Sequence, residues 1–466
     1  MWFLYHASHA NLLLYRLLYM LMLYDTLRKQ IKALERGMIM GAFDKIIGYA
    51  SMKEELRQIS DMLKRREEYN KMGARLPRGI ILFGEPGVGK TLMAECLIED
   101  CGVRSFLLRR YKTGNDFLRT ISDTFKQAKA SAPSIVLLDD LDKFGSDESP
   151  DCFGEYSAVQ AGIDSLKDTD VLVVATVNYI YNLPVSLTRP GRFDRKIKIK
   201  LPTTSDVELL LKHLIGGKKL SSNVNIDDIT KAVAFDTCAD LEMLLNEAAI
   251  YATYSGRAEI ETSDLIQVII RKEYDSCSCN FLRGQAVPRE LALHEAGHAV
   301  ACEILNPGSV GIISVLAAAQ QQHGKRGFVR LCKEVEDYPD RVLHLLASKA
   351  AVEQYSEGEY ARGGSTDLEE ALSIMREAAF SRGAFGLDYV MTQDGFSREL
   401  SQNTLYRAEQ LIYAELNGCM LKAKKIVTQN REFLERIADA LMKKHVLLYS
   451  EIQDIRNDCC DLPFGV

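Results

Sequence analysis

The chain has 466 residues, 47% of them hydrophobic and 26% charged, so it is long enough for two or three soluble domains with separate cores. Its formal net charge of −6 argues against nucleic acid as the main partner, because binding a phosphate backbone requires a basic surface. The 11 cysteines are scattered, without the spacing of a disulfide framework or a structural zinc site, which favours a reducing, cytoplasmic compartment for the folded domains.

The N-terminal residues 1–24 are strongly apolar and long enough to cross a bilayer. Arg16 near their centre costs roughly 3 kcal/mol on insertion, about as much as the leucines return. Two interpretations stay open: a membrane anchor that leaves the remaining chain in the cytoplasm, or an amphipathic interface helix. Residues 25–41 are predicted to form a linker helix.

Residues 42–202 alternate short apolar runs with helical stretches. The runs are GIILF at 79–83, SFLL at 105–108, SIVLLD at 134–139 and VLVVAT at 171–176. Because these runs lack two-fold alternation, they indicate parallel strands buried on both faces by helices. The segment is therefore predicted to be an α/β domain with a parallel sheet.

Helical periodicity replaces the strands after residue 202. Residues 203–274 are predicted to be a helical subdomain, 275–288 a linker, and 289–466 a mainly helical domain. Within the last domain one β-like run, SVGIISV at 309–315, is expected to be an edge strand that could pair with an extended peptide.

GEPGVGKT at 84–91 fits the pattern G-x-x-x-x-G-K-[ST] between a predicted strand and a predicted helix. Such glycines let backbone N–H groups turn around a β-phosphate at a helix N-terminus. Lys90 is expected to reach the β- and γ-phosphates, and Thr91 to hold Mg²⁺. A plain glycine-rich turn is the alternative, which the strand and helix on either side disfavour. The predicted nucleotide-binding residues here are Gly84, Glu85, Pro86, Gly87, Val88, Gly89, Lys90 and Thr91.

Two aspartates follow the run SIVLL, at the carboxyl end of a predicted strand, where open α/β sheets bind ligands. Asp139 is predicted to be the Mg²⁺ partner, and Asp140 to polarise the attacking water. An acidic surface loop is the alternative, which the apolar residues before the pair disfavour.

With these motifs in this order, the chain resembles the AAA ATPases. TVNYIYNLPVSLTRPGRFDRKIKIKLP is similar to their sensor strand and second region of homology. The resemblance implies that Asn178 senses the γ-phosphate, and that Ile47 and Gly48 contact adenine. It also implies that Arg192 and Arg195 reach a neighbouring subunit's nucleotide, where they would neutralise developing charge. Arginines that act in trans imply a ring, here a homo-hexamer.

LALHEAGHAVACEIL at 291–305 contains H-E-x-x-H. His294 and His298 would share one face of a helix and could bind one Zn²⁺, with Glu295 taking a proton from the attacking water. An ordinary amphipathic helix is the alternative, but the apolar flanks disfavour it because an uncompensated buried polar cluster is costly. A catalytic zinc needs a third ligand, which spacing alone does not identify. The candidates left open are His323, His344, His445 and many carboxylates.

From about residue 42 to 450 the chain resembles the FtsH family, which joins an AAA module and its helical lid to a helical zinc peptidase bearing HEAGH. That family has a later aspartate in G-x-x-x-D-L, and ARGGSTDL here makes Asp367 the implied third ligand. TDLE at 366–369 is also a capping box, and both functions are compatible. The resemblance implies an ATP-dependent zinc metalloendopeptidase that unfolds and degrades proteins, with Zn²⁺ and Mg²⁺–ATP as cofactors.

The chain departs from the family pattern at several points. The usual glutamate after the Walker aspartate is Asp140, one methylene shorter, and a displacement near 1 Å can cost on the order of 10²-fold in rate. Only Tyr111 and Phe117 offer a pore-loop aromatic, and each could equally pack on the sheet. Bacterial members usually carry two membrane spans, whereas at most one is expected here.

Two alternatives therefore stay beside the protease hypothesis. One is an ATP-dependent remodelling or holding factor with a weak ATPase and a mainly structural peptidase half. The other is a peptidase that degrades unfolded chains without ATP.

Overall fold

The structure is a computed structural model that describes residues 41–75, 77–111, 115–145, 152–274, 287–316, 327–335, 337–356, 365–387 and 401–459. The predicted membrane or amphipathic segment at 1–24 and all but the last residue of the predicted linker helix at 25–41 lie outside these residues. In the described part of the chain, no helix combines the length and the apolar character needed to cross a membrane. The chain divides between Lys200 and Leu201 into two compact units.

The first unit contains a five-stranded sheet in the order β2-β3-β4-β1-β5, and every neighbouring pair is parallel. The predicted parallel sheet is confirmed, and the predicted strands correspond to β1–β4. Strand β5, which pairs with β1 at the edge of the sheet, was not predicted from the sequence. The strands are β1 (Gly79–Phe83), β2 (Arg104–Leu108), β3 (Ser134–Leu138), β4 (Val171–Val177) and β5 (Arg195–Lys198).

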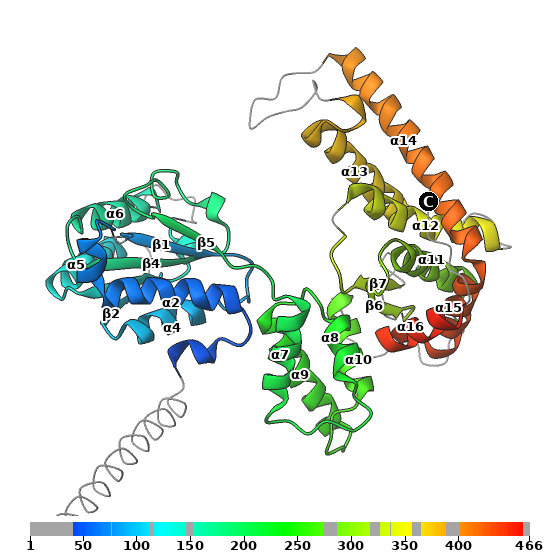
Figure 1. Cartoon of the computed structure of the whole chain (residues 1–466), viewed down its shortest axis with the longest axis horizontal. Coiled ribbons are helices and arrows are strands. Elements are labelled where there is room, and N and C mark those ends of the chain that lie inside the picture. The colour runs from blue at the N-terminus through cyan, green and yellow to red at the C-terminus, as the bar shows by residue number, and fades with distance from the viewer. Residues whose placement is uncertain are drawn as a thin grey trace, which may run out of the picture. The chain divides into compact units, whose positions relative to one another are not determined.

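Helices cover both faces of this sheet, as continuous apolar strands require (Figure 1). On one face, Phe117, Ile121 and Phe125 of α5 pack with Ile163 of α6 and with alternate strand residues such as Val136. Helix α4 packs against β1 and β4, with α2 beside it. The helices are α2 (Ala50–Lys64), α3 (Arg66–Lys71), α4 (Lys90–Cys101), α5 (Asn115–Ala130) and α6 (Cys152–Ser165), with short 3-10 helices η1 (Ala42–Lys45), η2 (Leu141–Lys143) and η3 (Ile180–Asn182).

The second unit begins with four helices: α7 (Thr204–Ile215), α8 (Ile226–Ala232), α9 (Cys238–Tyr254) and α10 (Thr262–Glu273). Local sequence sets two of their starts. Thr203 accepts a hydrogen bond from the backbone N–H of Asp206, and Thr237 does the same for Asp240, each in a capping box. The segment is helical, as predicted.

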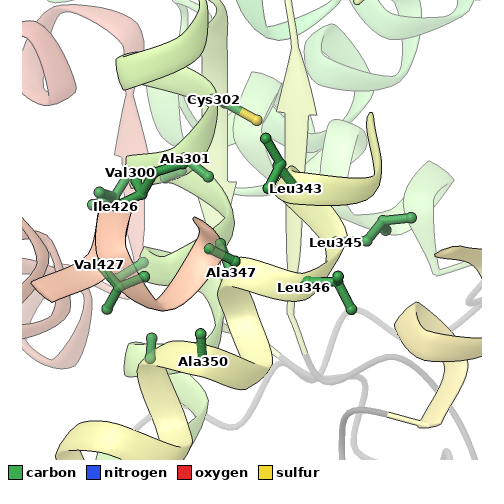
Figure 2. Close-up of a cluster of buried hydrophobic side chains, with 14 of the residues drawn as sticks. Val300, Ala301, Cys302, Leu343, Leu345, Leu346, Ala347, Ala350, Ile426 and Val427 are labelled. Atoms are coloured by element: carbon green, nitrogen blue, oxygen red, sulfur yellow. The ribbon is translucent and has the colours of Figure 1, made fainter. Parts of the chain in front are cut away.

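The remainder of the second unit is mainly helical, as predicted. Its long helices pack around α11, and Figure 2 shows apolar side chains of α11, α12 and α14 meeting in one core. The helices are α11 (Arg289–Leu305), α12 (Tyr338–Tyr355), α13 (Ser365–Arg382), α14 (Gln402–Gln429), α15 (Arg431–Lys444) and α16 (Tyr449–Asp458), with η4 (Ala384–Gly386) after α13.

A small antiparallel sheet in the order β7-β6-β8 accompanies these helices. Its strands are β6 (Val310–Ser314), β7 (Phe328–Leu331) and β8 (Val446–Leu448). Strands β7 and β8 were not predicted from the sequence, because runs of only three or four residues do not stand out among helices. The predicted edge strand at 309–315 is wrong: β6 is the middle strand, and both its edges are already paired.

The helices α7–α10 and the small sheet belong to one folded body. Asp228 of α8 accepts hydrogen bonds from the backbone N–H (2.7 Å) and hydroxyl (2.8 Å) of Ser450 at the start of α16. Tyr274, just after α10, packs edge-on against Phe328 of β7, with ring centroids 5.8 Å apart. A methyl group on Gly311 of β6 would lie 2.1 Å from a backbone oxygen of α8, so only glycine allows this approach. The predicted lid subdomain and predicted peptidase domain are thus packed together.

Candidate nucleotide and metal sites

The glycine-rich loop at 84–89 leads from β1 directly into α4, which begins at Lys90. The Lys90 side chain is folded back on the loop, where Nζ donates to the carbonyl oxygens of Gly84 and Glu85 at 2.8 Å each. Burial lowers the pKa of Lys90, and nearby Asp140 opposes this effect. A cation beside the N-terminus of α4 suits a phosphate group. The loop therefore fits a nucleotide.

Asp139 lies at the end of β3 and is 1% exposed. Its Oδ1 accepts hydrogen bonds from the hydroxyls of Thr91 (2.9 Å) and Thr176 (2.7 Å). Its Oδ2 is paired with the guanidinium of Arg109. Thr91 and Asp139, the two residues predicted to hold Mg²⁺, are thus in direct contact. The predictions did not include Arg109 or Thr176, which come from neighbouring strands.

Asp140 caps η2 with a left-handed backbone (φ 54°). Its carboxylate accepts a hydrogen bond from Lys143 Nζ at 2.7 Å. Asn178 follows β4, and its backbone N–H donates to Asp142 Oδ2 at 2.9 Å. Asp142, another residue that the sequence analysis missed, therefore ties the predicted sensor residue to the loop that contains Asp140.

The two arginines predicted to act in trans have contacts within their own unit. Arg192 forms a bidentate salt bridge with Asp164, in which Nε donates to Oδ1 and Nη2 donates to Oδ2, each at 2.9 Å. Arg195 is the first residue of β5, and its Nη2 lies 3.9 Å from the sulfur of Met62. A contact with a neighbouring subunit's nucleotide stays a prediction for both.

The predicted adenine contacts, Ile47 and Gly48, are half-buried in the turn between η1 and α2. η1 packs against α4, the helix that the glycine-rich loop opens. The two candidate pore aromatics differ. Phe117 is 3% exposed and packs edge-on against Phe144, so it belongs to the core, whereas Tyr111 is 72% exposed.

In the second unit, α11 and α13 bring three predicted ligands together. Asp367 Oδ2 lies 3.1 Å from His294 Nε2 and 3.4 Å from His298 Nε2. One ligand atom from each residue lies within 4.8 Å of the others. A tetrahedral Zn²⁺ with bonds of about 2.0–2.1 Å separates its ligands by about 3.4 Å. The spacing and the two-histidine, one-carboxylate donor set therefore fit zinc.

Neighbouring groups orient these side chains. His298 Nδ1 donates to the backbone oxygen of His344 at 3.0 Å, which leaves Nε2 as the ligand atom. Ser348 donates its hydroxyl hydrogen to Asp367 Oδ2 at 3.1 Å. Burial by itself raises the pKa of Asp367, but hydrogen bonds with His294 and His298 outweigh it and hold that pKa well below its usual range. Asp367 is thus ionised, as a metal ligand must be.

The structure also shows where two of the other histidines lie that the sequence had left open as third zinc ligands. The His344 ring lies 3.0 Å from Cys302 Sγ, and burial lowers the pKa of His344 to about 3. His445 ends α15 with a left-handed backbone, and its carbonyl accepts from Val315 N–H at 3.0 Å. Neither joins the metal cluster among the described residues, and His323 lies outside them.

Glu295 lies between the two histidines on α11 and is 4% exposed. The backbone of Gly327, which precedes β7, passes so close that a Cβ there would lie 2.3 Å from Glu295 Oε1. Gly327 carries no motif that could have identified it from the sequence. The contact places the start of β7 next to the carboxylate predicted to activate water.

The chain is similar to known proteins over most of its length. The model of the ATPase family associated with various cellular activities (AAA) matches residues 80–201. The ATP-dependent zinc metalloprotease FtsH of Mycoplasma pneumoniae is 31% identical over 442 residues, covering 89% of this chain and 62% of the relative. A protein of the same name from Thermus thermophilus is 29% identical, covering 89% of this chain and 70% of its own length. The ATP-dependent zinc metalloprotease FtsH 2 of Sphaerobacter thermophilus is 28% identical, and the match covers 94% of this chain and 70% of the relative.

The chain is similar to FtsH proteins over most of its length, and to the AAA family model over residues 80–201. The similarity to these FtsH proteins covers 89–94% of the chain and therefore includes residues of both units. The chain spans about three-fifths of the length of the FtsH proteins from two Mycoplasma species, 62% of one and 63% of the other.

Proposed function

We propose that this chain is a member of the FtsH family and an ATP-dependent zinc metalloendopeptidase that unfolds and degrades proteins. The observation that carries the proposal is the convergence of His294, His298 and Asp367 around a space of zinc size, with Glu295 beside them. The printed names of the relatives, ATP-dependent zinc metalloproteases, support the same activity.

In the peptidase half, His294, His298 and Asp367 would hold Zn²⁺, which supplies a Lewis acid that activates water and polarises the peptide carbonyl. Glu295 takes the proton of the attacking water and delivers it to the departing amine. His298 keeps the required tautomer because its Nδ1–H is bound to the backbone oxygen of His344. Glu295 and His298 are buried, at 4% and 7% exposed, beside the apolar core that α11 helps to form.

In the ATPase half, residues 84–91 would hold the phosphates, with Ile47 and Gly48 at adenine, and Thr91 and Asp139 would hold Mg²⁺. Asp140 would orient the attacking water, and Asn178 would sense the γ-phosphate through the loop that Asp142 ties to it. Asp140 must first leave Lys143, which is exposed and therefore costs little to release.

Further proposals concern assembly. Arg192 and Arg195 would act on a neighbouring subunit's nucleotide, which requires a ring, and we propose a homo-hexamer. Exposed Tyr111 is the proposed grip on the substrate chain. Residues 1–24 are proposed to contact a membrane and leave the two units in the cytoplasm.

The test is degradation of an unstructured protein by the purified chain with Zn²⁺ and ATP, beside Glu295→Gln. We expect ATP-dependent cleavage that falls at least 10²-fold in Glu295→Gln, while bound zinc stays unchanged. Glu369→Gln, an exposed change on α13, is the matched control and should retain activity.

A remodelling or holding factor is the second candidate, and the shorter Asp140 carboxylate favours it. Zinc binding and ATP turnover without any cleavage by the wild-type chain would contradict the protease proposal and support this candidate. Cleavage that is equal with and without ATP would instead support a peptidase that does not need its ATPase.

A further inference from the structure

The carboxylate of Asp139 already has a cation bound to it in the structure. We propose that Arg109 is a positioning residue of the ATPase site: without nucleotide it neutralises the outer oxygen of Asp139, and Mg²⁺–nucleotide binds in competition with it. The inference rests on the proposed nucleotide-binding function and adds a magnesium-responsive residue to it.

Sheet topology places Arg109 next to Asp139. β2 and β3 are parallel neighbours, paired in register up to Leu108 and Leu138. The backbone N–H of Asp139 donates to the carbonyl of Leu108 at 2.9 Å, so the residues that follow the two strands lie side by side. The guanidinium of Arg109 therefore reaches Asp139 Oδ2 across one strand spacing.

The two oxygens of Asp139 have different partners. Oδ1 accepts from two neutral hydroxyls, of Thr91 and Thr176, whereas Oδ2 faces the charged Arg109. Because the Asp139 side chain is only 2% exposed, its charge needs a counter-ion. In the nucleotide-free chain Arg109 supplies that counter-ion.

Mg²⁺ would compete for this carboxylate. A magnesium ion held by Thr91 and Asp139 would place two positive charges a few ångströms from the guanidinium, where like charges repel. The Arg109 side chain is 46% exposed, so it can move into solvent without a large desolvation change. Asp139 would exchange a monovalent partner for a divalent one.

The neighbouring Arg110 is held in place, so only the Arg109 side chain is expected to move. Arg110 is buried against Glu155, with 3.2 Å between Nε and Oε2 and side-chain exposures of 13% and 3%. Its Nη1 also donates to the carbonyl of Lys143 at 3.2 Å. Arg110 therefore anchors the backbone at the end of β2, while Arg109 can exchange partners.

The experiment titrates Mg²⁺ against the full chain at a fixed concentration of a fluorescent ADP analogue, with zinc held constant. For Arg109→Gln we expect half-maximal magnesium-dependent binding at a roughly tenfold lower Mg²⁺ concentration, because the competing charge is gone. Arg109→Lys keeps the charge with poorer geometry and should fall between wild type and Arg109→Gln. Arg104→Gln, an exposed arginine at the other end of β2, is the matched control and should behave as wild type.

A second readout is the melting temperature in magnesium-free, nucleotide-free buffer, which should fall for Arg109→Gln because Asp139 loses its counter-ion. Arg109→Gln could melt at a lower temperature and still bind nucleotide with an unchanged or increased Mg²⁺ requirement. That result would overturn the proposed competition between Arg109 and Mg²⁺, but it would leave the ATPase proposal intact. If Arg109→Gln does not fold, an unchanged Mg²⁺ requirement in Arg109→Lys overturns it equally. Absence of nucleotide binding by the wild-type chain at any Mg²⁺ concentration would overturn the proposed ATPase itself.

Discussion

Two buried glutamates on α11 show how surroundings separate residues of one type. Glu303 is fully buried and accepts the backbone N–H groups of Gly308 (2.8 Å) and Val310 (2.9 Å), so it fixes the entry to β6. Glu295, two turns earlier, lies between the metal-site histidines and against Gly327. Only the second is placed to act on water, although both look alike in the sequence.

Gly327→Ala should impair catalysis while leaving the metal in place. The new methyl group would lie 2.3 Å from Glu295 Oε1, so the carboxylate must move. We expect kcat for a short peptide to fall by about 10²-fold, since a shift of about 1 Å at a reacting group has that effect. Zinc content and kcat are the measurements, and Gly217→Ala, which has open space, is the control. Unchanged kcat would contradict this prediction, because the carboxylate would then act equally well from a shifted position.

Asp367→Asn should weaken zinc binding, because a neutral amide replaces the anionic ligand between His294 and His298. We expect the affinity to fall by more than about 100-fold, the upper range for losing a supporting group alone. Competition with a coloured chelator measures this affinity, and Glu369→Gln on the same helix is the control. Wild-type affinity in Asp367→Asn would place the third ligand elsewhere.

At the scale of elements, the glycine in HEAGH has a packing function that the motif did not reveal. A Cβ on Gly297 would lie 2.6 Å from the carbonyl oxygen of Ala347 and 2.8 Å from Ser348 Cα. These are backbone atoms of α12, which cannot move aside as a flexible side chain would. Gly297 therefore permits the close approach of α11 and α12 that brings the His344 carbonyl to His298.

Gly297→Ala should destabilise the second unit by about 1–3 kcal/mol, the usual cost of overpacking a core. Gly418→Ala on α14 is the matched control because its Cβ meets open space. That change should stabilise the protein by about 0.4–1 kcal/mol, through the lower entropy of the unfolded chain. Urea unfolding followed by circular dichroism measures both, and equal effects of the two changes would contradict this packing function.

At the scale of the whole molecule, the predicted lid helices support the strand beside Glu295. Arg330 of β7 is paired with Asp236, which lies between α8 and α9 and also accepts from Lys272 at 3.0 Å. Phe328 of the same strand packs against Tyr274. These contacts hold β7, and hence Gly327, against the helices α7–α10 of the same unit.

We therefore expect residues 201–466 to fold as a fragment, bind zinc and cleave short peptides without nucleotide. A fragment of residues 287–466 lacks α7–α10, which exposes Gly311 and leaves Arg330 without Asp236. It should melt at a lower temperature and cleave the same peptides more slowly. Calorimetry and peptide assays on the two fragments test this, and equal melting temperatures would show that the helices only neighbour the peptidase domain.

Local sequence patterns were sufficient to predict much of the fold and of the two candidate sites. The parallel sheet, the glycine-rich loop and H-E-x-x-H were readable because each depends on residues adjacent in the chain or one helical turn apart. The short strands β5, β7 and β8 were not, because three or four residues carry no periodicity of their own.

Long-range packing decided the remainder. The family resemblance had already implied Asp367 as the third ligand, whereas composition left His344 open. The fold brings Asp367 of α13, and not His344 of α12, into one cluster with the two histidines. It likewise made β6 a central strand, buried Phe117 in the core and brought Arg109 to Asp139. Such choices join residues tens of positions apart, and their free energies arise only when the chain closes into its tertiary structure.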